Sequence, residues 1–69
     1  MIRLKVKEVA QQKGISQGLL SRTANVDLNT LRRIFRDPAA VIQTATLDRL
    51  AKALDVHPCE LFEYTPDKP

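Results

Sequence analysis

Two predicted helices are joined by only three residues, and this short connection limits the folds that the chain can adopt. Ser16 is a good N-cap for a helix over residues 17–24, and Asp27 is a good N-cap for a helix over residues 28–36. Asn25, between them, tolerates the left-handed backbone conformation that a tight helix end requires. Helices connected this closely must pack against each other at a steep angle.

Three further helices are predicted around this pair. Hydrophobic residues spaced three and four apart favour a helix between residues 5 and 13. Thr44 or Thr46 caps a fourth helix that Asp55 ends, and a short fifth helix begins at Pro58. The sequence therefore predicts an all-α domain of five helices.

The two ends of the chain are open to two interpretations. Apolar and basic residues alternate over residues 2–7, and aromatic residues alternate over residues 62–64, which is the period of a strand. One hypothesis is that these segments pair as a short β-ribbon, within one chain or across a dimer. The alternative is that both termini fray. No internal repeat or long linker interrupts the chain, which predicts a single domain over residues 1–69 with a flexible tail over residues 65–69.

Charge is distributed unevenly along the chain. Residues 1–36 hold eight bases and two acids, a net charge of +6, whereas residues 37–69 hold three bases and six acids, a net charge of −3. A basic half favours a polyanion as partner, with nucleic acid ahead of a membrane surface. The alternative is a solvated surface with an accidental gradient.

Composition excludes several other classes. The single cysteine, Cys59, cannot form an internal disulfide or a cysteine-based zinc site. No apolar run approaches the ~18–20 residues of a membrane span, and the N-terminus lacks the apolar block of a signal peptide. No group of side chains resembles a catalytic cluster. We therefore expect a cytoplasmic protein that is not an enzyme, has no metal or cofactor, and does not bind membranes.

The second helix of the closely joined pair has two opposite faces. At about 100° per residue, Leu31 and Ile34 fall on one side, and Asn29, Arg33 and Arg36 fall on the other. Asn bonds adenine through two atoms, and Arg bonds guanine likewise. A helix about 10–12 Å wide also fits the major groove of B-DNA. The pattern predicts a DNA-reading helix; the alternative is that its arginines only solvate the surface.

The segment over residues 17–36 resembles the helix-turn-helix motif of the Cro/CI-like (XRE) repressor family. The apolar positions of that motif are held here by Leu20, Ala24, Val26, Leu31 and Ile34. Ser21 and Asn25 stand where the family usually has Ala and Gly. Residues 14–17, 46–56 and 60–62 look like the family's first turn and its last two helices, so the resemblance covers about residues 5–63. It implies a compact five-helix, lambda-repressor-like domain that regulates transcription by binding specific duplex DNA, as a repressor.

The resemblance also implies roles for individual side chains. The residues expected to read bases, here called the base-reading set, are Gln17, Leu28, Asn29, Arg32 and Arg33. The residues expected to bind DNA phosphates, here called the phosphate set, are Arg22, Thr30, Arg36, Gln43 and Thr44.

Two positions depart from the family pattern. Ala10 and Phe35 stand where many members carry Arg and Glu, which pair between the first and third helices. One hypothesis is that an apolar contact replaces that ion pair; the alternative is two unrelated substitutions. Leu28 either meets a thymine methyl group or covers the neighbouring helix.

The expected partners follow from the size of the domain. A lone domain reads only a few base pairs, so we expect a homodimer on an inverted repeat, with contacts from the acidic C-terminal half. The alternative function is an antitoxin-like or adaptor module, whose main partner is another protein and whose DNA binding is secondary.

Overall fold

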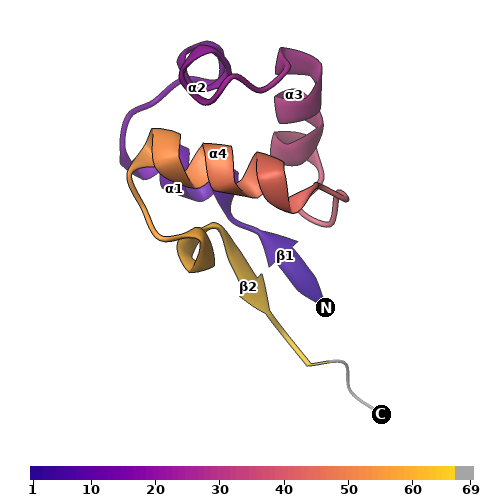
Figure 1. The fold of residues 1–69 in the computed structure, drawn as a ribbon. Coiled ribbons are helices and arrows are strands. Elements are labelled where there is room, and N and C mark those ends of the chain that lie inside the picture. Colours follow the sequence, from indigo (N-terminus) through magenta and orange to yellow (C-terminus); the bar gives the residue numbers. More distant parts are fainter. Residues whose placement is uncertain (67–69) are drawn as a thin grey trace.

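The protein is mostly helical, with a small sheet at one end. Its structure, a computed structural model, describes residues 1–66. In chain order the elements are β1 (Ile2–Leu4), α1 (Val6–Gln12), α2 (Gln17–Ala24), α3 (Leu28–Arg36), α4 (Thr44–Leu54), the 3₁₀ helix η1 (Pro58–Leu61) and β2 (Phe62–Tyr64). Figure 1 shows the two strands side by side at the end of the molecule opposite α2. Within residues 1–66, no helix is long and apolar enough to cross a membrane.

The connection between α2 and α3 has the tight geometry that the sequence predicts. The Ser16 hydroxyl accepts a hydrogen bond from the Leu19 backbone N–H (3.2 Å), which caps the start of α2. Asn25 ends α2 in the left-handed conformation, with φ 55° and ψ 48°. The Ser21 hydroxyl then donates to the Val26 carbonyl oxygen (2.5 Å) across the turn. As a result, α2 is seen almost end-on in Figure 1 while α3 lies in the plane of the view.

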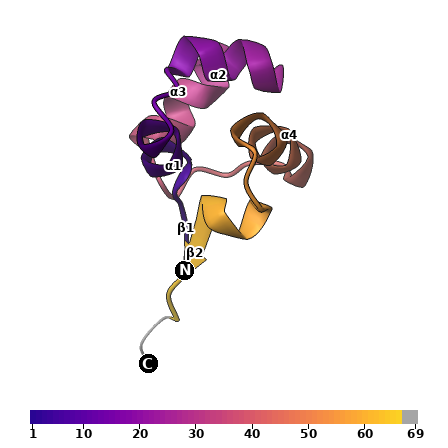
Figure 2. The same cartoon turned by 90° about the vertical axis from the view of Figure 1, so that its left-hand side faces the viewer.

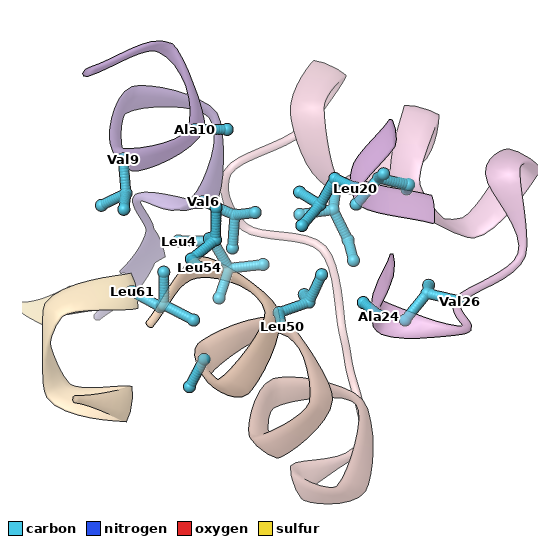
Figure 3. Packing of buried hydrophobic residues seen from close by; sticks show 13 residues of the cluster. Leu4, Val6, Val9, Ala10, Leu20, Ala24, Val26, Leu50, Leu54 and Leu61 are labelled. Carbon is cyan, nitrogen blue, oxygen red and sulfur yellow. The ribbon is translucent and has the colours of Figure 1, made fainter. Parts of the chain in front are cut away.

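One apolar core holds all of these elements together. It contains 13 buried residues: Leu4, Val6, Val9, Ala10, Leu20, Ala24, Val26, Leu31, Ile34, Leu50, Ala51, Leu54 and Leu61. No polar or charged side chain among residues 1–66 is buried. Figure 3 shows side chains from α1, α2, α4 and the two ends of the chain meeting in the same space. Packing therefore fixes the helices without any buried polar network.

The β-ribbon hypothesis is confirmed in its single-chain form. The strands are antiparallel, with Ile2 opposite Tyr64 and Leu4 opposite Phe62. The Thr65 N–H donates to the Met1 carbonyl oxygen (2.8 Å), which extends the pairing beyond β2. The last residues of the expected flexible tail, 67–69, lie outside the described part of the chain.

The expected count of five helices is wrong, because residues 1–66 form four α-helices. The segment predicted as the fifth helix is a single 3₁₀ turn, η1. Its start is as expected, since Pro58 is the first residue and the Glu60 carboxylate accepts a hydrogen bond from the His57 N–H (3.0 Å). Phe62 is already extended, with φ −151° and ψ 160°, because it begins the strand that pairs with β1. The four residues before that strand are too few for an α-helix. The expected all-α class is also wrong, since the fold is mostly helical with a two-stranded sheet.

Candidate nucleic-acid interface

Helix α3 is anchored by one apolar face. Leu31 is fully buried and Ile34 is 2% exposed, while Phe35 is half-buried against the same core. Burial of each of the first two side chains contributes about 1.5–3 kcal/mol. The Leu31 N–H donates to the Asp27 carbonyl oxygen (3.0 Å), but the Asp27 side chain makes no capping hydrogen bond, contrary to expectation. The position of α3 therefore depends on packing more than on its cap.

The opposite face of α3 is cationic and open to solvent. Asn29, Arg32, Arg33 and Arg36 are all exposed. None of these arginines forms an ion pair within residues 1–66; the ion pair that occurs there lies on α4. Guanidinium groups without a carboxylate partner keep their attraction for an external anion. This face of α3 is thus available to a polyanion, as the helical periodicity predicts.

A shallow cavity of about 450 Å³ lies beside this face. Thr30 and Arg33 line it from α3, and Gln43 and Thr46 line it from the start of α4. The Arg33 Nη2 group donates a long hydrogen bond (3.5 Å) to the Val41 carbonyl oxygen in the loop between the two helices. Hydroxyl, amide and guanidinium groups are all suitable donors to a phosphate oxygen. The cavity therefore brings one residue of the base-reading set together with two of the phosphate set.

The other predicted contact residues lie outside that cavity. Gln17 and Leu28 are the first residues of α2 and α3, and both are half-buried. Arg22 is exposed in the last turn of α2, and Thr44 is exposed as the first residue of α4. The half-burial of Leu28 is compatible with both of its expected roles, because part of the side chain packs and part stays accessible.

Sequence reasoning missed Thr46 as a residue of this surface. Thr46 was expected only as a cap alternative to Thr44, but Gln43 occupies the N-cap position of α4 and Thr46 faces the cavity. A signal was present in the spacing. Thr46 follows Gln43 by three residues, and residues three apart lie on the same side of a helical turn. The hydrogen bond that the Val41 carbonyl oxygen accepts from Arg33 has no signal in the sequence, since every residue carries a carbonyl group.

The two apolar substitutions in the family pattern lie on helices that contact each other. Ala10 is fully buried on α1, and Phe35 is half-buried on α3. A charge at the first of these positions would be desolvated, at a high cost in free energy. The α1–α3 contact is therefore apolar, which accords with the hypothesis that packing replaces an ion pair here.

Comparison with known proteins points to the same kind of surface. The family model for the Cro/C1-type helix-turn-helix DNA-binding domain matches residues 4–67 of this 69-residue chain. The match includes α2, the turn after it and α3. No curated protein matches the chain.

Proposed function

Since the chain belongs to the Cro/C1-type helix-turn-helix DNA-binding family, we propose that it is a sequence-specific repressor of transcription and that α3 enters the major groove. The observation that carries this proposal is the exposed Asn and Arg face of α3, on a helix whose other face is buried. A helix about 10–12 Å across fits a groove about 12 Å wide.

In this arrangement, the base-reading set acts at the floor of the groove. Asn29 bonds adenine through its N6 and N7 atoms, and Arg33 bonds guanine through O6 and N7. Leu28 packs against a thymine methyl group at the start of α3. Gln17 and Arg32 complete the set from the start of α2 and from the flank of α3. Bidentate contacts of this kind discriminate between base pairs by about 1–3 kcal/mol each.

The phosphate set holds the domain in register on the backbone. Thr30 and Gln43 offer donors from opposite sides of the cavity beside α3, and Thr44 begins α4 next to it. Arg22 and Arg36 add exposed positive charge on either side of the turn. The first turn of α4 contains no acidic residue, so nothing there repels a phosphate. Repression follows when the bound protein covers DNA that RNA polymerase would otherwise occupy.

Selection of bound sites from random duplex DNA tests the proposal. We expect one enriched sequence, on which Asn29→Ala loses about 1–3 kcal/mol of binding free energy because a bidentate base contact is lost. Gln12→Ala is the matched control, since Gln12 is an exposed amide on α1 that belongs to neither the base-reading set nor the phosphate set. Failure to enrich any sequence, or equal affinities of the two variants, would contradict the assigned role of α3.

A further inference from the structure

The carboxylate of Asp27, the residue before α3, has no partner within residues 1–66. Asp27 occupies the N-cap position, yet its side chain makes no capping hydrogen bond. The ion pair that occurs in this part of the chain lies on α4 and does not include Asp27. The residues three and four positions further on, Thr30 and Leu31, are not basic, so the helix itself offers no pairing partner. An exposed carboxylate is therefore left at the start of the proposed DNA-reading helix.

The backbone of Asp27 is fixed, although its side chain is free. Its carbonyl oxygen accepts a hydrogen bond from the Leu31 N–H (3.0 Å), which closes the first turn of α3. Val26 is 7% exposed and Leu31 is fully buried, so the core anchors the chain on both sides of Asp27. In Figures 1 and 2 the connection between α2 and α3 lies at the end of the molecule opposite the ribbon, so neither strand covers it. The carboxylate thus projects from a fixed point and is open to an external partner.

A carboxylate in this position is unfavourable for binding to DNA in general. The N-terminal residues of a recognition helix lie against base edges in the major groove, and Asp27 immediately precedes those residues of α3. An ionised carboxylate accepts hydrogen bonds and donates none. It therefore repels phosphate oxygens and the acceptor atoms of the bases. Of the groups on the base edges of that groove, an amino group is the one that can donate to it.

Cytosine offers a more suitable amino group than adenine. These two bases carry an amino group in the major groove, at N4 and at N6 respectively. Adenine N6 lies between two acceptors, its own N7 and O4 of the paired thymine, and both repel a carboxylate. Cytosine N4 has an acceptor on one side alone, which is O6 of the paired guanine. A carboxylate can therefore approach cytosine with less repulsion.

We propose that Asp27 is a specificity-determining residue, whose carboxylate accepts a hydrogen bond from the N4 amino group of one cytosine in the bound site. The inference rests on the proposed function, since it requires α3 to lie in the major groove. It adds a residue that belongs to neither the base-reading set nor the phosphate set. Asp27 strengthens binding where cytosine faces it and weakens binding to other sequences, because there its charge is desolvated without a partner.

The variant Asp27→Asn tests this inference. Asparagine has nearly the same shape and is an equally good N-cap residue, so the start of α3 is preserved. Selection from random duplex DNA should give cytosine at one position for the wild type. The variant should lose that preference and favour adenine there, which an amide bonds through two atoms. The other positions of the selected site should not change.

Affinities on two duplexes give a second measurement. On the site selected by the wild type, Asp27→Asn should lower affinity about fivefold or more, which is the cost of one mismatched base pair. On a scrambled duplex it should raise affinity, because a negative charge has been removed from a surface that faces DNA. A partly unfolded variant would bind both duplexes more weakly. Changes of opposite sign therefore separate a loss of specificity from a loss of stability.

Asp55→Asn is the matched control. Asp55 is an exposed acidic residue that ends α4 with a φ of 55°, a conformation that asparagine also adopts at Asn25. It belongs to neither the base-reading set nor the phosphate set. This substitution removes the same charge and should leave unchanged both the selected sequence and the ratio of the two affinities.

The possible outcomes distinguish this inference from the proposed function. An unchanged base preference in Asp27→Asn, or an equal fall in affinity on both duplexes, overturns the inference. The proposed function survives that result where Asn29→Ala still weakens binding to the selected site. Failure of the wild type to select any sequence overturns the proposed function and the inference together.

Discussion

Asn25 occupies a backbone conformation that most residues avoid. Its φ of 55° lies in the left-handed region, where a Cβ atom approaches the neighbouring carbonyl oxygen and costs roughly 1–2 kcal/mol. We expect Asn25→Ala to lower the free energy of unfolding by about 1 kcal/mol, as measured by urea denaturation, because alanine keeps the Cβ atom but lacks the polar side chain that lets asparagine tolerate this conformation. Asn25→Gly should stay within a few tenths of the wild-type value, because glycine adopts this φ freely. Equal destabilisation by both substitutions would mean that the amide side chain, and not the backbone conformation, is what matters.

Arg33 and Arg36 are close in sequence but are expected to have different roles. Arg33→Ala should lose about 1–3 kcal/mol on the selected site and should relax specificity at one base position, because a base contact disappears. Arg36→Ala should weaken binding to all sequences alike and should lower the slope of log K against log salt by about one, because a phosphate contact disappears. Fluorescence anisotropy on selected and scrambled duplexes, at several salt concentrations, measures both effects.

A different result for Arg33→Ala would contradict the role expected for Arg33. Arg33 lies beside the Val41 carbonyl and lines the cavity with Thr30 and Gln43. If Arg33→Ala weakens selected and scrambled DNA by the same factor, Arg33 belongs to the phosphate set and Asn29 and Arg32 carry the specificity from α3.

At the scale of whole elements, the contact between α1 and α3 is one of those that hold α3, the proposed DNA-reading helix, in place. The hypothesis that Ala10 and Phe35 replace an ion pair predicts energetic coupling between the two positions. Ala10→Arg and Phe35→Glu should each destabilise the protein, since each places a charge at a packed position. The double variant should recover at least about 0.5 kcal/mol relative to the sum of the two single effects.

Chemical denaturation of the four proteins in this cycle measures the coupling. Additive effects would show that the two positions do not interact and that the substitutions are unrelated. The pair Ala10→Val and Phe35→Leu is the control, because it changes packing volume without introducing charge.

The elements that the sequence predicted well are those that begin and end by local chemistry. α2 starts at the cap on Ser16 and ends at Asn25, and α4 ends at Asp55, which also has a φ of 55°. η1 was predicted less well, because a helical start signal at Pro58 is followed within four residues by a strand. The partner that makes that segment a strand is β1, about 60 residues away in sequence.

At the scale of the whole molecule, the homodimer expected on an inverted repeat has to match the repeat of DNA. Two copies bound to such a repeat should place their α3 helices about 34 Å apart, which is one turn of B-DNA. Inserting about 5 base pairs between the selected half-sites should reduce affinity to that of one half-site, because the second site rotates to the far side of the duplex. Fluorescence anisotropy on duplexes with and without the insertion measures this change in affinity. Undiminished joint binding would show that the copies bind independently.

The exposed residues of α3 could be predicted from the sequence, but the way in which α3 and α4 together form the candidate site could not. Periodicity placed Asn29, Arg33 and Arg36 on one exposed face, since side-chain direction along a helix follows from the number of residues per turn. The cavity beside Arg33 could not be foreseen in the same way. It forms only when the start of α4 folds back against α3, so the spacing of Thr46 from Gln43 did not by itself show that both side chains face α3.

The sequence by itself determined the features that depend on neighbours within a few residues: the cap on Ser16, the left-handed turn between α2 and α3, and the buried and exposed faces of α3. Tertiary structure alone decided how distant segments meet, including the single-chain pairing of β1 with β2, the shortening of the last helix to one 3₁₀ turn, and the apolar groove that β1 forms with the α3–α4 loop. The physical reason is that hydrogen bonds within a helix form between residues about four apart. The ribbon, in contrast, requires closure of a loop of about 60 residues, and the common core offsets the entropy of that closure.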